Sequence, residues 1–597
     1  FSFQLLEALG DVETDLLLDA IDEAERTQLI TALEDGQEAH FTFAHELIRQ
    51  TLVSGLSMPR RQRMHLRVAE GMEQVYVRDL EEHAADLAHH LYQAGAAADP
   101  DKTGGYLTQA GDHAMASTAF EDALRHYESA LSLQADEERK ARADLLYKRG
   151  SALRSLGRWD EAFADWREVL AICEELGDID GVGHVSRELG WQLGWAYRLV
   201  EGLEVELHGL SILGDVVSAD RCALMALAGN CMSMGGDRAG GDPMIARAMA
   251  MAQELGDERL LAEVLMNKAY HHFYYSQPQE MLDAGLRATD LLRSARDLWG
   301  LANVLWTPQT ALLCLGRLDE VAEIGEELEP LADRVGHKGV LMTARRNRGI
   351  REFMLTADID GFAEFARGDL ELCRSADLPW IFFSYSFVGM AHFWRGNWRD
   401  ALTSFEEAVG VDPSGVYAGT GWAKLFVGQA YAQNRSEALA ILKEQRDNLP
   451  QPGQANPYGA WEMLGAAIEG LSVLGEREEA GALYPLILEE TRTGAIMRWD
   501  GPRLLQTTAG IAAACGRQWE KAEEHYETAL RQAHELPHKM EQPEVRRWYA
   551  RMLIDRDGPG DRDRARELLT EALVMYRKIG MPKHIEMAEI MLGEVKV

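Results

Sequence analysis

One spacing of side chains recurs along most of this 597-residue chain. A small residue is followed by an aromatic residue four positions later and by a second small residue after three more. These three positions share one face of an α-helix, so the pattern predicts helices that pack through that face. The small residues let a neighbouring helix approach closely, and the aromatic ring fills the gap between helix pairs. Clear copies are Ala123/Tyr127/Ala130, Ala401/Phe405/Ala408 and Ala522/Tyr526/Ala529.

The copies follow one another at intervals of about 40 residues and several come directly after a turn. Examples of such turns are "LGRWDEA" (156–162), "RGNWRDA" (395–401) and "CGRQWEKA" (515–522). Glycine in the turn can adopt the left-handed conformation that ends the preceding helix. Looser copies also occur, among them Gly202/Glu206/Gly209. The first small position, or its equivalent, falls near residues 123, 162, 202, 241, 281, 321, 362, 401, 438, 480, 522 and 565.

This pattern resembles the tetratricopeptide repeat, whose standard hairpin has about 34 residues. The longer interval is similar to the long-helix variant of bacterial regulatory proteins. The resemblance implies an all-α fold, a right-handed superhelical solenoid of about twelve helical hairpins. We expect connecting helices and the first hairpin over residues 76–133, and the solenoid with its C-terminal capping helices over residues 134–597.

Residues 1–75 do not follow the repeat. Alternation at Phe41 and Phe43 predicts a short strand, and the leucines that follow fall at helical spacing. The whole segment indicates two helices, a strand and two further helices. It resembles the winged-helix module that follows the nucleotide-binding domain in STAND signal-transduction ATPases. Similar proteins are the large ATP-dependent LuxR-type transcription regulators and the ATPase-linked nucleotidyl cyclases of bacteria.

The resemblance implies a longer parent protein, in the order effector, NTPase, winged helix and repeat sensor. The chain begins at Phe1 without a Met, so we expect it to be a fragment of that parent. In related ATPases a Met-His-Asp triplet places a His on the ADP phosphates, and Ala44-His45-Glu46 occupies the matching place here. His45 is therefore the candidate phosphate-sensing residue, since imidazole can donate to phosphate oxygen. The alternative is a His that satisfies a hydrogen bond at a helix start.

We expect no cofactor in this chain, although the parent would bind ATP or ADP. The sequence has no G-x-x-x-x-G-K-[ST] motif, and "MGGDRAGGDP" (234–243) lacks the Lys and hydroxyl that bind phosphate and Mg²⁺. A metal site is also unexpected. His83, Asp86 and His89 have helical spacing, but no cysteine or further ligand lies nearby in the sequence.

Charge and cysteine content limit the partners and the compartment. A net charge of −36 argues against direct binding of nucleic acid or anionic membranes. The basic run "PRRQRMHLR" (59–67) then indicates a solvated face or a contact with the NTPase rather than a nucleic-acid site. The six cysteines form no C-x-x-C pair, which favours reduced thiols and a cytoplasmic location. The uncharged runs 298–316 and 378–394 contain polar residues, so we interpret them as buried repeat helices.

Solenoids of this family bind along a concave surface lined by the first helix of each hairpin. Counting back from the second helices, the inward positions of the central hairpins hold Asn230, Tyr270, Tyr274, Asn303, Trp306, Asn347, Arg351, Phe383 and Trp394. Aromatic faces mixed with amide and guanidinium donors suit a polar organic ligand or a peptide. The cationic run "TARRNRGIR" (343–351) suggests an anionic group on that ligand. The alternative is that these side chains form the core between hairpins and that the arginines offset acidic neighbours.

We find no convincing catalytic triad, Cys–His pair or paired carboxylates, so we do not expect an enzyme. The sequence instead predicts a sensor or interaction module. It would bind a small ligand or a protein in the groove, with ligand-induced oligomerisation as a further expectation. The event would pass to the N-terminal NTPase and effector domains, whose type stays open between DNA-binding and cyclase. The alternative function is a free-standing tetratricopeptide-repeat scaffold for protein–protein assembly.

Overall fold

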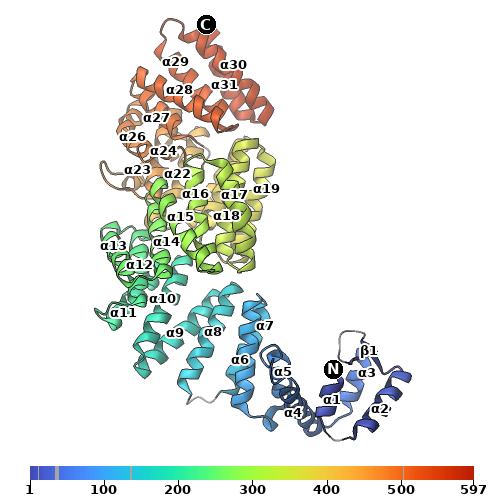
Figure 1. The fold of residues 1–597 in the computed structure, drawn as a ribbon. Helices are drawn as coiled ribbons and strands as arrows, with labels where there is room; N and C mark the ends of the chain where they lie inside the picture. Colours follow the sequence, from blue (N-terminus) through green and yellow to red (C-terminus); the bar gives the residue numbers. More distant parts are fainter. Residues whose placement is uncertain (11, 34–38, 135–137, 502, 597) are drawn as a thin grey trace. The chain divides into compact units, whose positions relative to one another are not determined.

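The computed structural model describes residues 1–10, 12–33, 39–134, 138–501 and 503–596. Helices α1 to α31 make up most of this described part, and one two-stranded sheet accompanies them (Figure 1). The chain forms two compact units, Phe1–Asp178 and Ile179–Val597. The boundaries expected near residues 75 and 133 stay predictions. No helix in the described ranges is long and apolar enough to cross a membrane.

Unit 1 opens with α1 (Phe3–Ala8), α2 (Thr14–Arg26), β1 (Ile30–Leu33) and β2 (His40–Phe43). The strands are antiparallel, with Ile30 opposite Phe43, and a small apolar core forms around Ile21, Ile30 and Phe41. The strand expected at Phe41–Phe43 is confirmed. Strand β1 was not predicted, because its four residues "ITAL" fit a helix as well as a strand.

The helix expected after the strand is α3 (Glu46–Ser54). Two of its leucines do not face a core, since Leu47 is 74% exposed and Leu52 is 57% exposed. Unit 1 continues with α4 (Met58–Val75), α5 (Ala84–Ala94), η1 (Gly95–Ala97), α6 (Pro100–Ala116), α7 (Phe120–Leu133), α8 (Arg139–Ser155) and α9 (Trp159–Leu176). Helices α6 to α9 pack as two successive hairpins.

Unit 2 consists of further hairpins joined mostly by tight turns. Its first part contains α10 (Ile179–Trp195), α11 (Leu199–Leu213), α12 (Ala219–Met234), α13 (Arg238–Leu255), α14 (Glu258–Tyr274), α15 (Pro278–Ser294), α16 (Leu298–Cys314), α17 (Leu318–Arg334), α18 (Lys338–Thr356), α19 (Ile359–Ser375), α20 (Ile381–Trp394) and α21 (Trp398–Gly410). The uncharged runs are α16 and the segment around α20, both largely buried, as expected.

The second part of unit 2 contains η2 (Gly415–Tyr417), α22 (Thr420–Tyr431), α23 (Arg435–Glu444), η3 (Arg446–Asn448), α24 (Tyr458–Leu474), α25 (Arg477–Ala482), α26 (Tyr484–Thr491), α27 (Leu505–Cys515), α28 (Trp519–Glu535), α29 (Glu541–Arg556), α30 (Asp561–Ile579) and α31 (Pro582–Lys596). Three connections are longer than the usual turn: residues 411–419 before α22, 445–457 before α24 and 492–504 before α27. The first and the third carry aromatic residues into the site described below.

The predicted repeat is confirmed as an all-α solenoid of stacked helical hairpins. Each of the twelve small-residue positions lies at the fourth or fifth residue of the second helix of a hairpin. All twelve are buried, including the poorly matching Gly202, Met281 and Phe362 in the central hairpins. The pattern therefore placed the second helices correctly even where its aromatic position had changed.

A second regularity explains how the two helices of a hairpin approach. In several hairpins the first helix has a glycine at the point where a ring from the second helix packs against it. A Cβ on Gly150 would lie 2.6 Å from the Trp166 ring, and one on Gly510 would lie 2.7 Å from the Tyr526 ring. The ring follows its glycine by the same interval in each case, as it does in Gly111/Tyr127 and Gly389/Phe405. Glycine is needed there because any side chain would displace the ring.

Candidate ligand-binding pocket

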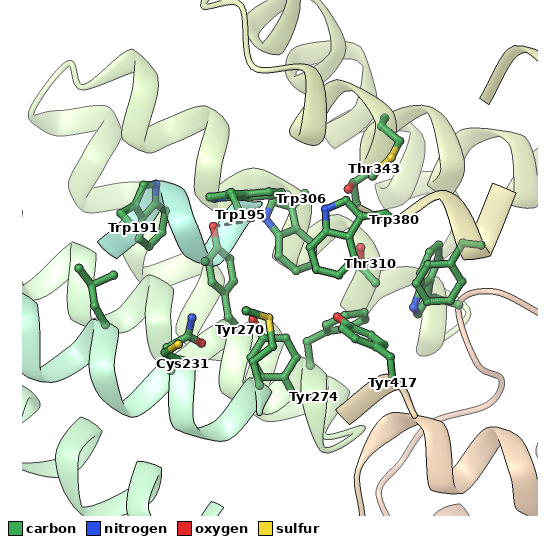
Figure 2. Close-up of a pocket in the computed structure, with 18 of the residues that line it drawn as sticks. Trp191, Trp195, Cys231, Tyr270, Tyr274, Trp306, Thr310, Thr343, Trp380 and Tyr417 are labelled. Carbon is green, nitrogen blue, oxygen red and sulfur yellow. Dashed lines mark hydrogen bonds between the residues drawn. The ribbon is translucent and has the colours of Figure 1, made fainter. Parts of the chain in front are cut away.

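A pocket in unit 2 lies where the first helices of six successive hairpins meet (Figure 2). Helices α10, α12, α14, α16, α18 and α20 each supply part of its wall. Its volume is about 770 Å³, the open space at its mouth included. Aromatic side chains form most of the lining: Trp191, Trp195, Tyr270, Phe273, Tyr274, Trp306, Trp380, Phe383, Tyr417 and Trp499.

The rings on one side of the pocket hold one another in place. Tyr270 stacks on Trp306 with ring centroids 5.0 Å apart, and Trp191 stacks on Tyr270 at 5.9 Å. The Tyr270 hydroxyl donates to the carbonyl of Asn303 at 2.5 Å, and Trp306 Nε1 donates to the Tyr270 hydroxyl at 3.3 Å. These contacts fix a continuous aromatic surface.

The 411–419 segment closes another part of the pocket and carries Tyr417. The Asp412 carboxylate accepts backbone hydrogen bonds from Gly419 at 3.0 Å and Gly421 at 2.8 Å. The Tyr197 hydroxyl donates to the Ser414 carbonyl at 2.5 Å. Gly415 has a φ of +72° and lies directly against the C-terminal end of α12, so a side chain there would clash with the Met234 carbonyl.

Two acceptor groups lie near α11 and α12. Glu206 on α11 is 2% exposed, and its Oε2 atom has no hydrogen-bond partner in the described structure. Burial raises the pKa of the Glu206 carboxyl well above its ordinary value. Asn230 on α12 is also buried, and its Oδ1 atom likewise has no partner among the described residues. Beside them the Cys231 thiol donates to the Leu199 carbonyl at 3.1 Å.

Donor groups lie around α18 and α20. Arg346 is buried and forms hydrogen bonds of 2.9 Å to both carboxylate oxygens of Asp369. It also donates to the Ser384 hydroxyl at 3.0 Å. The indole nitrogens of Trp380 and Trp499 are buried, and within the described residues neither has a hydrogen-bond partner. The pocket therefore has unsatisfied acceptors near α11 and α12 and unsatisfied donors elsewhere in its wall.

Five of the nine residues expected in the groove line this pocket together: Asn230, Tyr270, Tyr274, Trp306 and Phe383. The other four lie elsewhere. Asn303 donates to the Trp299 carbonyl at 3.0 Å and lies 3.1 Å from His337, so it packs behind the aromatic surface. Trp394 lines a second pocket in unit 2, beside charged side chains such as Lys424. Whether any of the nine binds a ligand stays a prediction.

Asn347 and Arg351 point toward neighbouring helices. Asn347 is buried and donates to Gln309 at 3.0 Å and to Thr310 at 2.9 Å. Arg351 donates to the Leu318 carbonyl at 2.6 Å and lies 3.9 Å from Asp319. The cationic run 343–351 thus has acidic groups beside Arg346 and Arg351.

Some residues that line the pocket were not predicted from the sequence. Trp191 and Trp195 are one helical turn apart on α10, a spacing that marks a shared face. Glu206 stands where the clear copies of the repeat have an aromatic residue. The sequence alone therefore marks this position as unusual. Tyr417 and Trp499 lie in the longer connections, where the repeat gives no register.

The remaining candidate residues lie outside this pocket. His45 is the residue before the first turn of α3, and its side chain forms no capping hydrogen bond. His83 stacks on Tyr76 at 3.8 Å. Among the residues that the structure describes, no group of three or more His, Cys, Asp or Glu could hold a metal ion. The glycine-rich segment 234–243 forms the turn into α13, where Asp237 accepts a hydrogen bond from Gly240 at 2.9 Å.

Comparison with known proteins agrees with a helical-repeat fold. A model of the tetratricopeptide repeat matches residues 142–176, which cover most of α8 and all of α9. No curated protein sequence matches the chain. The similar solved structures include the Cut9–Hcn1 hetero-tetramer of APC/C, which is 14% identical with a TM-score of 0.46, over 92% of this chain and 98% of that one.

Two further solved structures are similar with lower TM-scores. One is a STAND protein with a tetratricopeptide repeat sensor from Pyrococcus horikoshii, 12% identical with a TM-score of 0.29, over 74% of this chain and 63% of that one. The other is a Rap protein complexed with competence and sporulation factor, 11% identical with a TM-score of 0.29, over 74% of this chain and 96% of that one.

Proposed function

We propose that this chain is the non-catalytic sensor region of a cytoplasmic bacterial signal-transduction regulator, and that unit 2 binds a small ligand in the aromatic pocket. A helical-repeat fold of this type indicates an interaction scaffold. The finer assignment depends on one observation, which is the combination of an aromatic pocket with buried polar atoms that lack partners. Ligand sites are typically apolar clefts with a few oriented polar groups.

The unsatisfied atoms argue against a purely structural role for the pocket. Most buried polar side-chain atoms in folded proteins have a hydrogen-bond partner, because leaving one unpaired costs about 1–3 kcal/mol. Here Glu206, Asn230, Trp380 and Trp499 each leave an atom without a partner in the described structure, and all four line one pocket. A ligand with complementary groups would satisfy them.

Ligand binding can be tested by thermal unfolding of the whole chain in the presence of a library of small metabolites. A compound that binds the native state raises the melting temperature. We expect Trp306→Ala to abolish this shift for a pocket ligand, because Trp306 forms part of the aromatic surface. Trp519→Ala on α28 is the matched control and should keep the shift. Compounds that stabilise Trp306→Ala as well as the wild type would refute the pocket.

The proposed parent is a STAND-type ATPase, with residues 1–75 as its winged-helix segment and His45 sensing the ADP phosphates. The effector would be a transcription-regulator or cyclase domain. This part of the proposal has its own test, which is the coding sequence upstream of Phe1. A G-x-x-x-x-G-K-[ST] motif there is the expected result. A start codon directly before Phe1 would refute the ATPase parent and favour the free-standing scaffold.

A further inference from the structure

Glu206 occupies a position that a ring fills in other hairpins. Gly150 and Trp166 are the glycine and ring of the α8–α9 hairpin, and Gly190 and Glu206 stand at the same places in the α10–α11 hairpin. A Cβ on Gly190 would lie 2.6 Å from Glu206 Cγ, so the two residues are in the same close contact. The packing of the hairpin thus requires bulk at this place and gives no reason for a carboxyl group.

Within the described residues, the carboxyl group of Glu206 has no charged partner. Buried carboxylates in proteins are normally paired, because an isolated charge is expensive to remove from water. Asp369 on α19 follows this rule through its ion pair with Arg346, which lines the pocket. For Glu206, burial raises the pKa of the carboxyl group, and Oε2 has no partner among the described residues. The group would gain most from a positive charge brought by a ligand.

The neighbouring rings suit the same kind of ligand. In Figure 2, Trp191, Tyr270 and Cys231 lie on one side of the pocket, and Trp380 and Tyr417 lie on the other. Cys231 lies beside Glu206, and Glu206 packs against Gly190, the residue next to Trp191 in α10. The faces of Trp and Tyr attract ammonium groups through their ring quadrupoles.

We infer that the pocket binds an organic cation, with its ammonium group beside Glu206 and Asn230 and a flat apolar body against the surface that Trp191, Tyr270 and Trp306 form. This inference rests on the proposed function and names the chemical class of the ligand. The indole nitrogens of Trp380 and Trp499 are donors, so an oxygen acceptor at the far end of the ligand would complete the match.

Binding should also release a proton. Without a ligand, burial keeps Glu206 protonated at a pH where an exposed glutamate is ionised. A bound ammonium group favours the carboxylate, so the carboxyl proton leaves to solvent as the cation enters, and the net charge of the site does not change. The titratable group facing Glu206 from α12 is the Cys231 thiol, whose pKa is raised mainly by burial. Cys231 therefore stays protonated and does not contribute to the release.

Three probes that differ mainly in charge can test the inference: 3-phenylpropylamine, 3-phenylpropan-1-ol and 3-phenylpropionate. Each is titrated calorimetrically into the full chain, in two buffers of different ionisation enthalpy. We expect the amine to bind about tenfold or more tightly than the alcohol, and the propionate to bind weakest. The buffer dependence should show proton release for the amine alone.

Substitution of Glu206 then locates the effect. Glu206→Gln keeps the shape of the side chain, and we expect it to remove both the preference for the amine and the proton release. Glu204→Gln, on the exposed side of the same helix, removes a charge without touching the pocket and should behave as wild type. The melting temperature of each variant shows that it is folded.

The outcomes separate this inference from the pocket itself. Equal binding of amine and alcohol, or an amine affinity unchanged in Glu206→Gln, would overturn the cation inference. If the alcohol still binds and Trp306→Ala removes that binding, the pocket remains a ligand site of another class. Tightest binding of the propionate would also overturn the inference. No binding of any probe at millimolar concentration would count against the cation inference, and the metabolite library would still test the pocket.

Discussion

Arg346 and Asp369 form a two-pronged ion pair inside unit 2, with both nitrogen–oxygen distances at 2.9 Å and each side chain 2% exposed. The Ser384 hydroxyl donates to the same carboxylate at 2.6 Å. Arg346 lines the pocket, but its charge is already balanced. The pair explains why a cationic run in the sequence need not mark a site for anions.

Removing Asp369 should be costly. Asp369→Ala leaves the Arg346 guanidinium buried without its partner, and we expect the free energy of unfolding to fall by about 3–5 kcal/mol. The comparison is Glu329→Ala, which breaks the 2.8 Å ion pair of Arg348, a side chain that is 53% exposed. Exposed pairs contribute at most about 1 kcal/mol. Urea unfolding of both variants measures the difference, and equal losses would contradict the burial argument.

Glu206 should make the stability depend on pH. Its pKa in the folded chain is raised above that of an unfolded glutamate, which is about 4.3. The folded state therefore holds the proton to higher pH, and stability falls as pH rises from the unfolded pKa through the folded one. Glu206→Gln has no titratable group at this position, so its stability lacks this contribution to the pH dependence.

We expect the stability of Glu206→Gln relative to the wild type to increase between pH 5 and pH 8, by up to about 1.4 kcal/mol per pH unit. Other titrating groups cancel in this difference. Unfolding in denaturant at several pH values measures it. A difference that stays constant across the range would mean that the Glu206 pKa is the same in both states.

Tyr526 should be a major contributor to the C-terminal hairpins. It is 1% exposed, as expected from its place in the repeat, and its ring stacks on Tyr549 with centroids 5.4 Å apart. Tyr526→Ala should cost about 3–5 kcal/mol. Val574→Ala, at a side chain that is 63% exposed, should change stability by about 0.5 kcal/mol or less.

The damage from Tyr526→Ala should stay local, because each hairpin of a solenoid contacts mainly its neighbours. Hydrogen exchange should therefore quicken first in α27 to α31. Faster exchange that begins in unit 1 would contradict nearest-neighbour coupling.

Two glycines in unit 1 provide a matched pair for the hairpin contact. Gly150→Ala places a methyl group against Trp166, whose Nε1 donates to the Tyr147 carbonyl at 3.3 Å, and should cost about 1–3 kcal/mol. Gly105→Ala lies inside α6 with no atom within 4 Å of the new Cβ, so it should stabilise by about 0.4–1 kcal/mol. Thermal unfolding measures both. A stabilising Gly150→Ala would show that the ring moves freely.

His45 is tested in the longer parent protein. If it contacts the ADP phosphates, His45→Ala should loosen the ADP-bound off state and raise basal effector activity. His40→Ala, at the start of β2, is the control and should leave that activity unchanged. Unchanged activity and unchanged ADP affinity in His45→Ala would remove the proposed role.

Local periodicity explains which features the sequence could predict. The buried positions of a helix recur at fixed short intervals, so Ala123 and Ala522 mark their helices without knowledge of the rest of the fold. The looser Gly202 and Val321 did so as well. Pocket membership is harder, because neighbouring residues of a helix point about 100° apart. Arg346 lines the pocket, while the adjacent Asn347, a predicted groove residue, packs against α16.

The rest of the site depends on contacts between segments that are distant in the sequence. Tyr417 and Trp499 reach the pocket from irregular connections, where no repeat sets the direction of a side chain. Strand β1 was missed for a related reason, since its partner β2 determines it more than its own four residues do.

The pocket wall begins on α10 and ends at Trp499, so one molecule inside it would touch hairpins that are not neighbours. Without such an occupant, the hairpins of a solenoid can unfold one after another, starting from an end. An occupant that contacts six of them would act as a reversible cross-link across that span. With the pocket occupied, we expect this stretch to unfold as one cooperative block. Its free energy of unfolding should then fall more steeply with denaturant concentration than in the empty solenoid, because more surface becomes exposed in a single step.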